Sequence, residues 1–179
     1  QLQDVGIKAL TIHGRTRSQM YSGSADWDRI GEVKNNPRIH IPIIGNGDVN
    51  SPEKAREYFN RYGVDAIMIG RGSIGRPWIF KEIRHYLDSG ELLSPLSIKE
   101  HVEIVKRHLS LTVEWLGERK GILHTRRHIA VTFKGLPNFR DTKIKLLQSE
   151  NYQEIMDLLA SVEELYAGFN PLEALSSND

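Results

Sequence analysis

The chain contains no cysteine, and no hydrophobic run approaches the roughly 20 residues that a transmembrane helix needs. Without cysteine, these 179 residues can form no disulfide, no zinc–thiolate site and no cysteine nucleophile. The opening QLQDVGIKAL lacks the basic and apolar regions of a signal peptide. We therefore expect a soluble, cytoplasmic protein with neither a membrane nor a metal as a partner.

The formal net charge is only +1, but the charges are segregated along the chain. Residues 119–145 hold eight basic residues against one acidic residue, a net charge of +7, whereas residues 150–179 hold seven acidic residues and no basic one. A basic block of this kind can follow the phosphates of a nucleic acid. It can also be a solvated helix face that pairs with the acidic C-terminal helix, and the charges alone slightly favour this second interpretation.

The first 80 residues alternate between strand and helix patterns. Short apolar runs end in polar residues at 9–15, 41–48 and 65–72, and helical patterns follow each of them at 26–35, 51–63 and 74–87. Strands that are apolar on both faces are typical of a buried parallel sheet. The order β-α-β-α-β-α predicts an α/β fold with a parallel sheet and helices packed outside it.

The remaining residues show only helical patterns, which begin with the capping box SIKE at 97–100. Gly117 and Gly121 are expected to end the first helix. The predicted helices cover 97–116, 122–134, 141–148 and 151–166. A small all-α domain over 91–179 is therefore expected to follow an α/β domain over 1–90.

Two turns, NGD and GRG, each follow a predicted parallel strand and precede a helix. Ligands of α/β folds bind at this carboxyl edge of the sheet. Gly47, Gly70 and Gly72 would let backbone N–H groups approach an anion, and Arg71 would add a planar cationic donor. The pattern predicts a phosphate cradle, while the simpler interpretation is that these glycines only permit tight turns.

Four other polar residues near these turns have simpler explanations as well. Asp48 can be a ligand-side residue or an acceptor for the following helix turn. His13 ends the first strand and would face the same edge, although a histidine there often serves as a structural hydrogen-bond partner. Arg15 and Arg17 are expected to be solvated surface charges.

The segments LTIHGRTRSQMYSGSADW, IPIIGNGDV and DAIMIGRGSIGRPWIF together resemble the tRNA-dihydrouridine synthases, and KGLPNF resembles the C-terminal helical domain of the bacterial type B members. The resemblance implies a TIM barrel that binds FMN, with NAD(P)H as reductant, followed by a helical domain that holds tRNA. It also implies that hydride passes from the reduced flavin to uridine C6 and that a cysteine acid protonates C5. A flipped base would be needed.

The same resemblance assigns roles to individual residues. It implies that Asn46, Gly47 and Asp48 lie at FMN, that Gly70 and Arg71 lie at its phosphate, and that His13 lies beside the flavin. The basic block adds Arg126, Arg127 and Lys134 as candidate contacts to tRNA.

The chain departs from the family pattern because it has no counterpart of the earlier barrel strands or of the cysteine acid. The fold expected is therefore the last three βα units of a (β/α)₈ barrel followed by the helical domain. Three strands cannot close an eight-stranded barrel, and their open edge is expected to permit self-association. We expect a C-terminal portion that is inactive alone. The alternatives are another FMN- or phosphate-binding barrel enzyme and a non-catalytic RNA-binding module.

Overall fold

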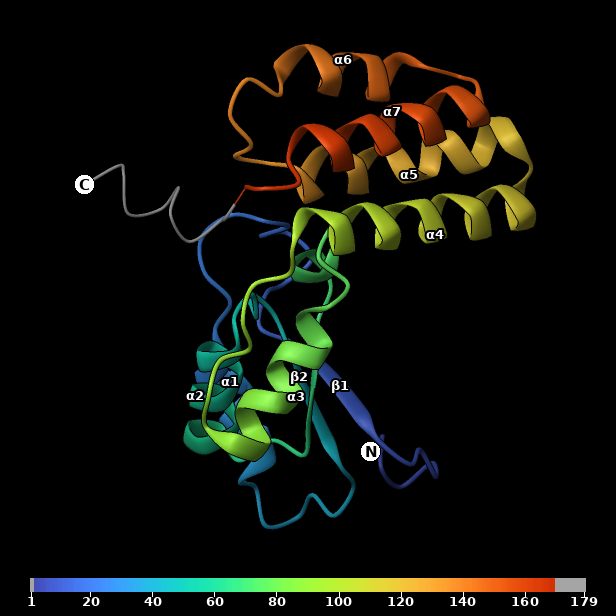
Figure 1. Ribbon diagram of the computed structural model, residues 1–179. Helices are drawn as coiled ribbons and strands as arrows, with labels where there is room; N and C mark the ends of the chain where they lie inside the picture. The colour runs from blue at the N-terminus through green and yellow to red at the C-terminus, as the bar shows by residue number, and fades with distance from the viewer. Residues whose placement is uncertain (1, 170–179) are drawn as a thin grey trace. The chain divides into compact units, whose positions relative to one another are not determined.

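The computed structural model describes residues 2–169, which fall into two compact units. The α/β unit contains the chain up to Ser73 together with Pro77–Leu93, and the helical unit contains Ile74–Arg76 together with the chain from Ser94 onward. Within the described residues, no helix is long and apolar enough to cross a membrane. Figure 1 labels the seven α-helices of the described residues and the strands β1 and β2.

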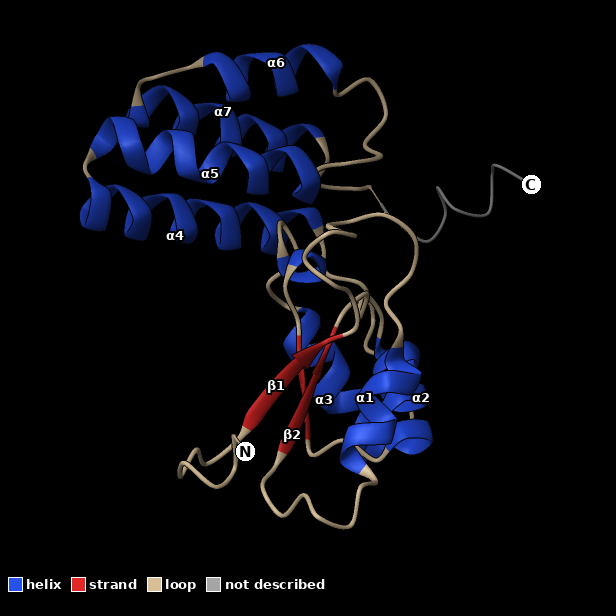
Figure 2. Cartoon of the chain, turned by 180° about the vertical axis from the view of Figure 1, so that it is seen from behind, coloured by secondary structure: helices blue, strands red, loops and turns tan. Residues whose placement is uncertain are grey.

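The α/β unit is built on three parallel strands in the order β1-β2-β3. They are β1 (Leu10–His13), β2 (Ile43–Asn46) and β3 (Ala66–Met68). The register pairs His13 with Asn46 and Asn46 with Met68, so the last residues of all three strands share one rung. The predicted α/β class and the parallel order are confirmed (Figure 2).

Three helices follow these strands, namely α1 (Trp27–Lys34), α2 (Pro52–Tyr62) and α3 (Ile79–Ser89). Asp26 caps α1, and Ser51 caps α2 by accepting the N–H of Lys54. Trp27 is the centre of the packing, because its ring contacts Tyr58 and Tyr62 and lies directly under Gly45, where a Cβ would be 2.3 Å from the indole. The helices therefore hold the sheet from one side through a continuous apolar core.

The prediction of a helix from residue 74 is wrong at its start. A short 3₁₀ helix, η1 (Arg71–Ser73), follows β3, and α3 begins only at Ile79. Gly75 adopts a φ of +69° and so interrupts any helix at this point. Pro77 cannot donate a backbone hydrogen bond, which delays the start of the helix further.

The helical unit contains α4 (Ile98–Leu116), α5 (Glu118–Thr132), α6 (Arg140–Gln148) and α7 (Tyr152–Leu165). Its core is formed by apolar side chains from all four helices. A buried hydrogen bond joins the hydroxyl oxygens of Thr112 on α4 and Thr125 on α5, which lie 2.8 Å apart. This all-α arrangement confirms the predicted second part of the fold class.

Gly121 does not end a helix, contrary to the sequence prediction. It lies inside α5, where a Cβ would be 2.6 Å from the backbone of Val113 on α4. The glycine permits close packing of two helices that have only Gly117 between them. The prediction relied on the low helix propensity of glycine, whereas the packing of α5 against α4 determines the residue at this position.

The proposed pairing of the basic block with the acidic C-terminal helix is not observed in the part of the chain that the structure describes. There, no ion pair joins the basic residues of 119–145 to an acidic residue of 150–169. Glu154 instead accepts a hydrogen bond from Ser149 at the start of α7. Within the described residues, the basic side chains therefore make no direct ion pair with the acidic helix.

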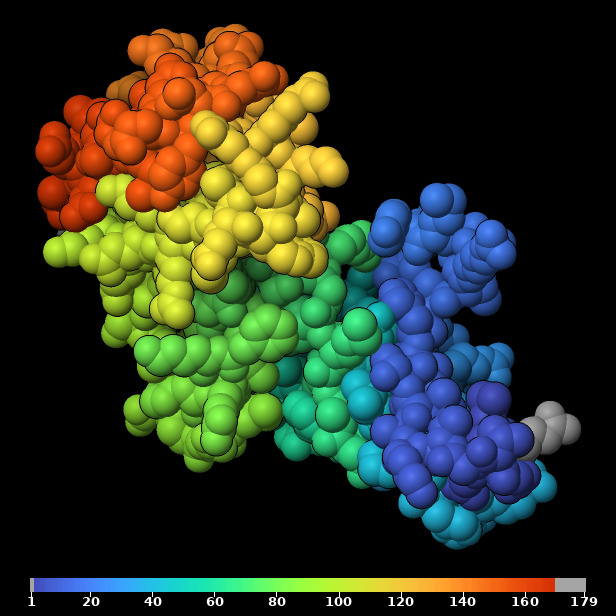
Figure 3. Space-filling model, turned by 90° about the vertical axis from the view of Figure 1, so that its right-hand side faces the viewer, coloured from blue at the N-terminus to red at the C-terminus, as the bar shows by residue number. Residues whose placement is uncertain are grey.

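The loop between β1 and α1 stands out from the surface of the α/β unit (Figure 3). Met20 and Tyr21 within it are about 70% exposed. The base of the loop is held much more firmly than its tip, as the contacts of Arg15 show below.

Candidate functional site

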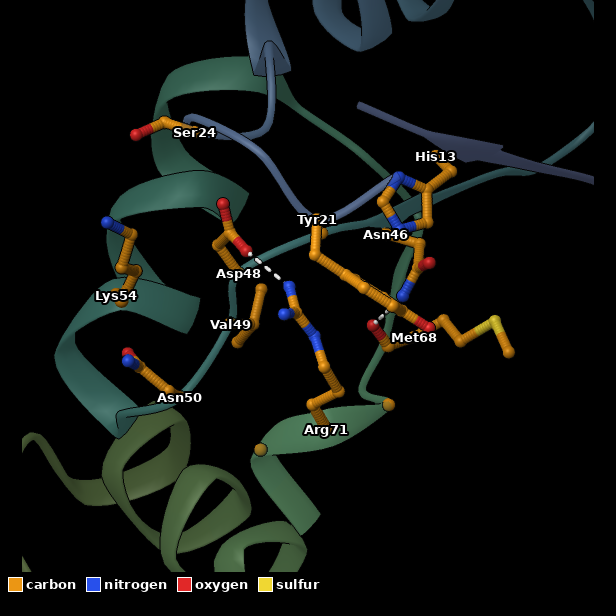
Figure 4. Close-up of a pocket in the computed structure, with 13 residues that line it drawn as sticks. His13, Tyr21, Ser24, Asn46, Asp48, Val49, Asn50, Lys54, Met68 and Arg71 are labelled. Carbon is orange, nitrogen blue, oxygen red and sulfur yellow. Dashed lines mark hydrogen bonds and ion pairs between the residues drawn. The ribbon is translucent and has the colours of Figure 1, made fainter. Parts of the chain in front are cut away.

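A hollow of about 640 Å³ lies at the carboxyl edge of the sheet, within the size range of small-molecule pockets. The last residues of the three strands, His13, Asn46 and Met68, line it together. The NGD turn after β2 and the GRG turn after β3 supply half of the other lining residues (Figure 4). The two turns are thus neighbours at one edge of the sheet, as the sequence predicted.

The glycines of these turns differ in what they allow. Gly70 has no atom within 4 Å of the place that a Cβ would occupy, so it leaves open space at the wall of the hollow. At Gly72 a Cβ would lie 2.5 Å from the carbonyl oxygen of Val49. Gly47 combines a φ of +133° with a clash of 2.6 Å against Ala25. Gly72 therefore permits close packing of the two turns, and Gly47 permits packing of the NGD turn against the loop between β1 and α1, whereas Gly70 keeps room for a ligand.

The prediction that Arg15 is a solvated surface charge is wrong. Its side chain is only 3% exposed and forms a bidentate ion pair with Asp48, with N···O distances of 2.8 and 2.7 Å. Asp48 also accepts the backbone N–H of Ala25 at 2.7 Å. The hydrogen bond from Arg15 lowers the pKa of Asp48, so this carboxylate stays ionised.

Asp48 therefore has a structural role, whatever it does toward a ligand. It connects the base of the β1–α1 loop to the NGD turn, across a sequence separation of more than 20 residues. Its φ of +55° places it in the left-handed region, which aspartate tolerates better than most residues. Among the described residues, the Asp48 carboxylate accepts from Arg15 and from the N–H of Ala25, and not from the turn of the following helix.

Arg71 is oriented from two sides. Its Nη2 lies 3.2 Å from the Asp48 carboxylate, and its guanidinium lies 4.4 Å from the centre of the Tyr21 ring. Figure 4 shows the side chains of Arg71 and Asp48 pointing toward each other, with a dashed line between them. Because the guanidinium remains about half exposed, it keeps further N–H donors for an anionic ligand.

Hydrogen bonds to neighbouring backbone groups determine which atoms of His13 and Asn46, on the last rung of the sheet, can donate or accept. The Nδ1 of His13 accepts the backbone N–H of Arg15 at 3.0 Å, so the neutral ring carries its proton on Nε2. The Nδ2 of Asn46 donates to the carbonyl oxygen of Met68 at 2.7 Å, which leaves Oδ1 as an acceptor. One donor and one acceptor are thus available side by side.

Sequence reasoning missed two contributors to this site. Lys54 lines the hollow from the first turn of α2 and adds a second cation. Tyr21 stacks on Arg71 from the β1–α1 loop. The position of Lys54 three residues after the Ser51 cap could have indicated it, because that position lies at the amino end of a helix that begins at the carboxyl edge. Nothing in the sequence pattern links Tyr21 to Arg71.

The three candidate RNA contacts lie in the helical unit, but their side chains differ. Arg126 donates through Nη2 to the carbonyl oxygens of Gln148 and Ser149 and so closes the end of α6. Arg127 is exposed and lies near two histidines. Lys134 is exposed just after α5.

Comparison with known proteins identifies the family of this chain. The family model for dihydrouridine synthases matches residues 1–166. The chain belongs to the dihydrouridine synthase (Dus) family. The resemblance stated from the sequence is confirmed, and the three parallel βα units are those expected of the C-terminal part of the Dus barrel.

Relatives carry the name tRNA-dihydrouridine synthase B. The chain is 49% identical to that of Shewanella oneidensis over 127 residues, which are 71% of this chain and 39% of the relative. For Proteus vulgaris the identity is 50% over 125 residues, or 70% of this chain and 38% of the relative. For Escherichia coli K12 it is 47% over 128 residues, or 72% and 39%. The chain thus spans about two fifths of the length of the curated Dus proteins that it matches.

Proposed function

We propose that this Dus chain is part of a flavin-dependent tRNA-dihydrouridine synthase, which reduces uridines of tRNA with FMN as cofactor and NAD(P)H as reductant. The family and the names of the relatives support the reaction class. The observation that carries the proposal is the hollow at the carboxyl edge, where His13, Asn46 and Arg71 converge.

The residues that line the hollow fit the phosphate of a flavin nucleotide. Arg71 and Lys54 supply two cations. The carboxylate of Asp48 lies 2.7 Å from Arg15 but 3.2 Å from Arg71, so it pairs mainly with Arg15 and leaves the charge of Arg71 for a ligand. Gly70 leaves the wall open where a side chain would project. We assign Gly70, Arg71 and Lys54 to the phosphate, with Gly47 and Asp48 shaping the wall that holds them.

The last rung of the sheet fits a heteroaromatic ring. His13 offers an Nε2–H donor and Asn46 offers an Oδ1 acceptor, and both are fixed by backbone contacts before a ligand arrives. When bound, FMN would supply the hydride chemistry that saturates the C5–C6 bond of uridine. This chain contains no cysteine, so its role is to bind and orient, not to donate the proton that the family resemblance assigns to cysteine.

We further propose that the helical unit contacts tRNA phosphates through the basic block, with Arg126, Arg127 and Lys134 as candidates. Within the described residues Arg127 and Lys134 form no ion pair, so their charges are available to an anionic partner, whereas the Nη2 of Arg126 already donates to two backbone carbonyl oxygens. A tRNA substrate would place the protein in the cytoplasm. We also propose that the open edge of the three-stranded sheet permits self-association of the isolated chain.

One experiment separates the two halves of this proposal. Arg71→Ala should weaken FMN binding and leave tRNA affinity nearly unchanged, whereas Arg126→Ala combined with Arg127→Ala should weaken tRNA binding and flatten its dependence on salt. Titrations of FMN and of tRNA against both variants would measure this. If Arg71→Ala leaves FMN affinity unchanged, the phosphate assignment is wrong.

A further inference from the structure

Asp48 is shared between two arginines, and it holds one of them more firmly than the other. Its Oδ1 lies 2.8 Å from Nη1 of Arg15 and 3.2 Å from Nη2 of Arg71. Its Oδ2 accepts from Nη2 of Arg15 and from the N–H of Ala25, both at 2.7 Å. A carboxylate offers about four lone-pair sites, so these contacts use its accepting capacity. The contact to Arg71 is the longest of them.

The two arginines differ in their access to a ligand. The side chain of Arg15 is only 3% exposed, and its Nε and Nη2 also donate to the carbonyl oxygens of Ser22 and Gly23 in the β1–α1 loop. The side chain of Arg71 is 53% exposed and lines the hollow. Two guanidinium charges thus meet one carboxylate, and the surplus positive charge is presented to the hollow on Arg71.

Removal of the buried cation would change that balance. Without Arg15, the Asp48 carboxylate would lose two of its four donors and keep Arg71 as the cation beside it. A carboxylate and a guanidinium form a bidentate pair when nothing else competes for them. Such a pair would occupy N–H donors of Arg71 and neutralise the charge that faces the hollow. Arg15 therefore acts on Arg71 through Asp48, without touching a ligand.

The β1–α1 loop also holds the face of the Arg71 guanidinium. The centre of the Tyr21 ring lies 4.4 Å from it, and a ring on the face of a guanidinium leaves the N–H groups at its edge free to donate. The backbone directly after Tyr21 is anchored by the hydrogen bonds from Arg15 to Ser22 and Gly23. Both contacts that orient Arg71 therefore depend on Arg15.

We propose that Arg15 is a positioning residue of the phosphate site, which occupies Asp48 so that the guanidinium of Arg71 stays available to the phosphate of a flavin nucleotide. The identity of this ligand rests on the proposed function, whereas the coupling of Arg15 to Arg71 does not need a flavin. Loss of the buried cation should weaken binding of the phosphate more than binding of the ring. Removal of the Asp48 charge as well should reverse that loss.

The first test compares FMN with riboflavin, which lacks the phosphate, in two variants that each remove one paired cation. Arg15→Met removes the cation at Asp48. Lys34→Met is the matched control, because Nζ of Lys34 lies 2.7 Å from the carboxylate of Asp65, which directly precedes β3 at the opposite edge of the sheet. Both flavins are titrated against the wild-type 179-residue chain and the two variants.

The two variants should differ in how they affect the preference for FMN. We expect Arg15→Met to weaken FMN binding at least roughly threefold more than riboflavin binding, a part of the loss typical of a charge-assisted hydrogen bond. Lys34→Met should change the ratio of the two affinities by less than about twofold, because solvent and salt screen a charge at the far edge. Equal weakening of both flavins by Arg15→Met would indicate a merely structural role and overturn the proposal.

A double variant provides the second test. Arg15→Met combined with Asp48→Asn removes both charges of the buried pair, so Arg71 again faces no competing carboxylate. The preference for FMN over riboflavin should return toward the wild-type value, a coupling that independent effects at two positions cannot produce. Failure of the preference to recover in the double variant would overturn the proposal.

Inorganic phosphate tests the same coupling without a flavin. Phosphate should shift the nitrogen-15 NMR resonance of the Arg71 Nε–H in the wild type, shift it less in Arg15→Met and shift it fully again in the double variant. If these shifts appear while the wild type binds both flavins equally, the positioning role stands and the proposed function fails. If the wild type prefers FMN and Arg15→Met retains that preference, the positioning role fails and the proposed function stands. Absence of both the phosphate shift and the FMN preference in the wild type would overturn both.

Discussion

Arg15 and Asp48 form a bidentate ion pair that ties the β1–α1 loop to the turn after β2, and the arginine side chain is almost fully buried. Asp48→Asn would leave that guanidinium without its counter-charge. We expect the free energy of unfolding of the α/β unit to fall by about 1–3 kcal/mol, the cost of an unsatisfied buried polar group. Urea denaturation followed by circular dichroism would measure it.

An exposed ion pair provides the control for that substitution. Asp28 and Arg61 lie 3.4 Å apart with both side chains more than half exposed. Asp28→Asn should therefore change the free energy of unfolding by less than about 1 kcal/mol. Comparable losses in the two variants would show that the burial of Arg15 contributes little.

Acid should destabilise the two units in different pH ranges. Burial lowers the pKa values of His101, His108 and His128 in the helical unit, so the unfolded chain binds more protons there once the pH falls below about 6.5. Stability of the helical unit is therefore lost as the pH decreases from about 6.5 toward 4.

The pKa values of two carboxylates in the α/β unit are also lowered, but these groups titrate at a lower pH than the histidines. Hydrogen bonds from Arg15 and Lys34 lower the pKa values of Asp48 and Asp65, whose contributions persist until the pH falls below their ordinary value of 3.8. Amide hydrogen exchange at pH 7, 5 and 3.5 should show α5 losing protection before β2. The reverse order would contradict the assignment of neutral histidines.

Gly70 and Gly72 should respond oppositely to the addition of one methyl group. Gly70→Ala meets open space, so the free energy of unfolding should change by less than about 1 kcal/mol while FMN binding weakens. Gly72→Ala would place a Cβ 2.5 Å from the Val49 carbonyl oxygen and should cost roughly 1–3 kcal/mol of stability. Thermal unfolding and FMN titration of both variants would test this, and unchanged FMN affinity in Gly70→Ala would show that its open space is not part of the site.

The isolated 179-residue chain should not reduce uridine. It has no cysteine to serve as the proton donor that the family resemblance implies, and its sheet has three strands in the described residues. Incubation with tRNA, FMN and NADPH, followed by mass spectrometry of the nucleosides, should show no dihydrouridine. Formation of dihydrouridine by the purified chain would refute this prediction.

Much of the α/β unit could be read from the sequence because local signals and tertiary packing agree there. The three strands were expected from short apolar runs that end in polar or glycine residues, and the structure ends them two to four residues before the ends of those runs, at His13, Asn46 and Met68. Parallel topology then brings the strand ends to one edge. The sequence also predicted that Ser51 caps α2 and that the helix begins at Pro52, as the structure shows. The convergence of the NGD and GRG turns needed no knowledge of distant contacts.

The errors arose where a residue's role depends on a partner far along the chain. Arg15 looked like a surface charge because its partner Asp48 lies 33 positions away. Gly121 looked like a helix stop because the backbone of α4, which needs its missing side chain, cannot be seen from local propensity.

The central claim is that the two glycine turns and Arg71 hold the phosphate of a flavin nucleotide. The most direct measurement compares FMN with riboflavin, which lacks only that phosphate, in titrations of the wild-type chain and of Arg71→Ala. The account predicts that the wild type binds FMN at least roughly tenfold more tightly than riboflavin and that Arg71→Ala removes most of this difference. Equal affinity of the wild type for the two flavins, or a preference for FMN that survives in Arg71→Ala, would contradict it.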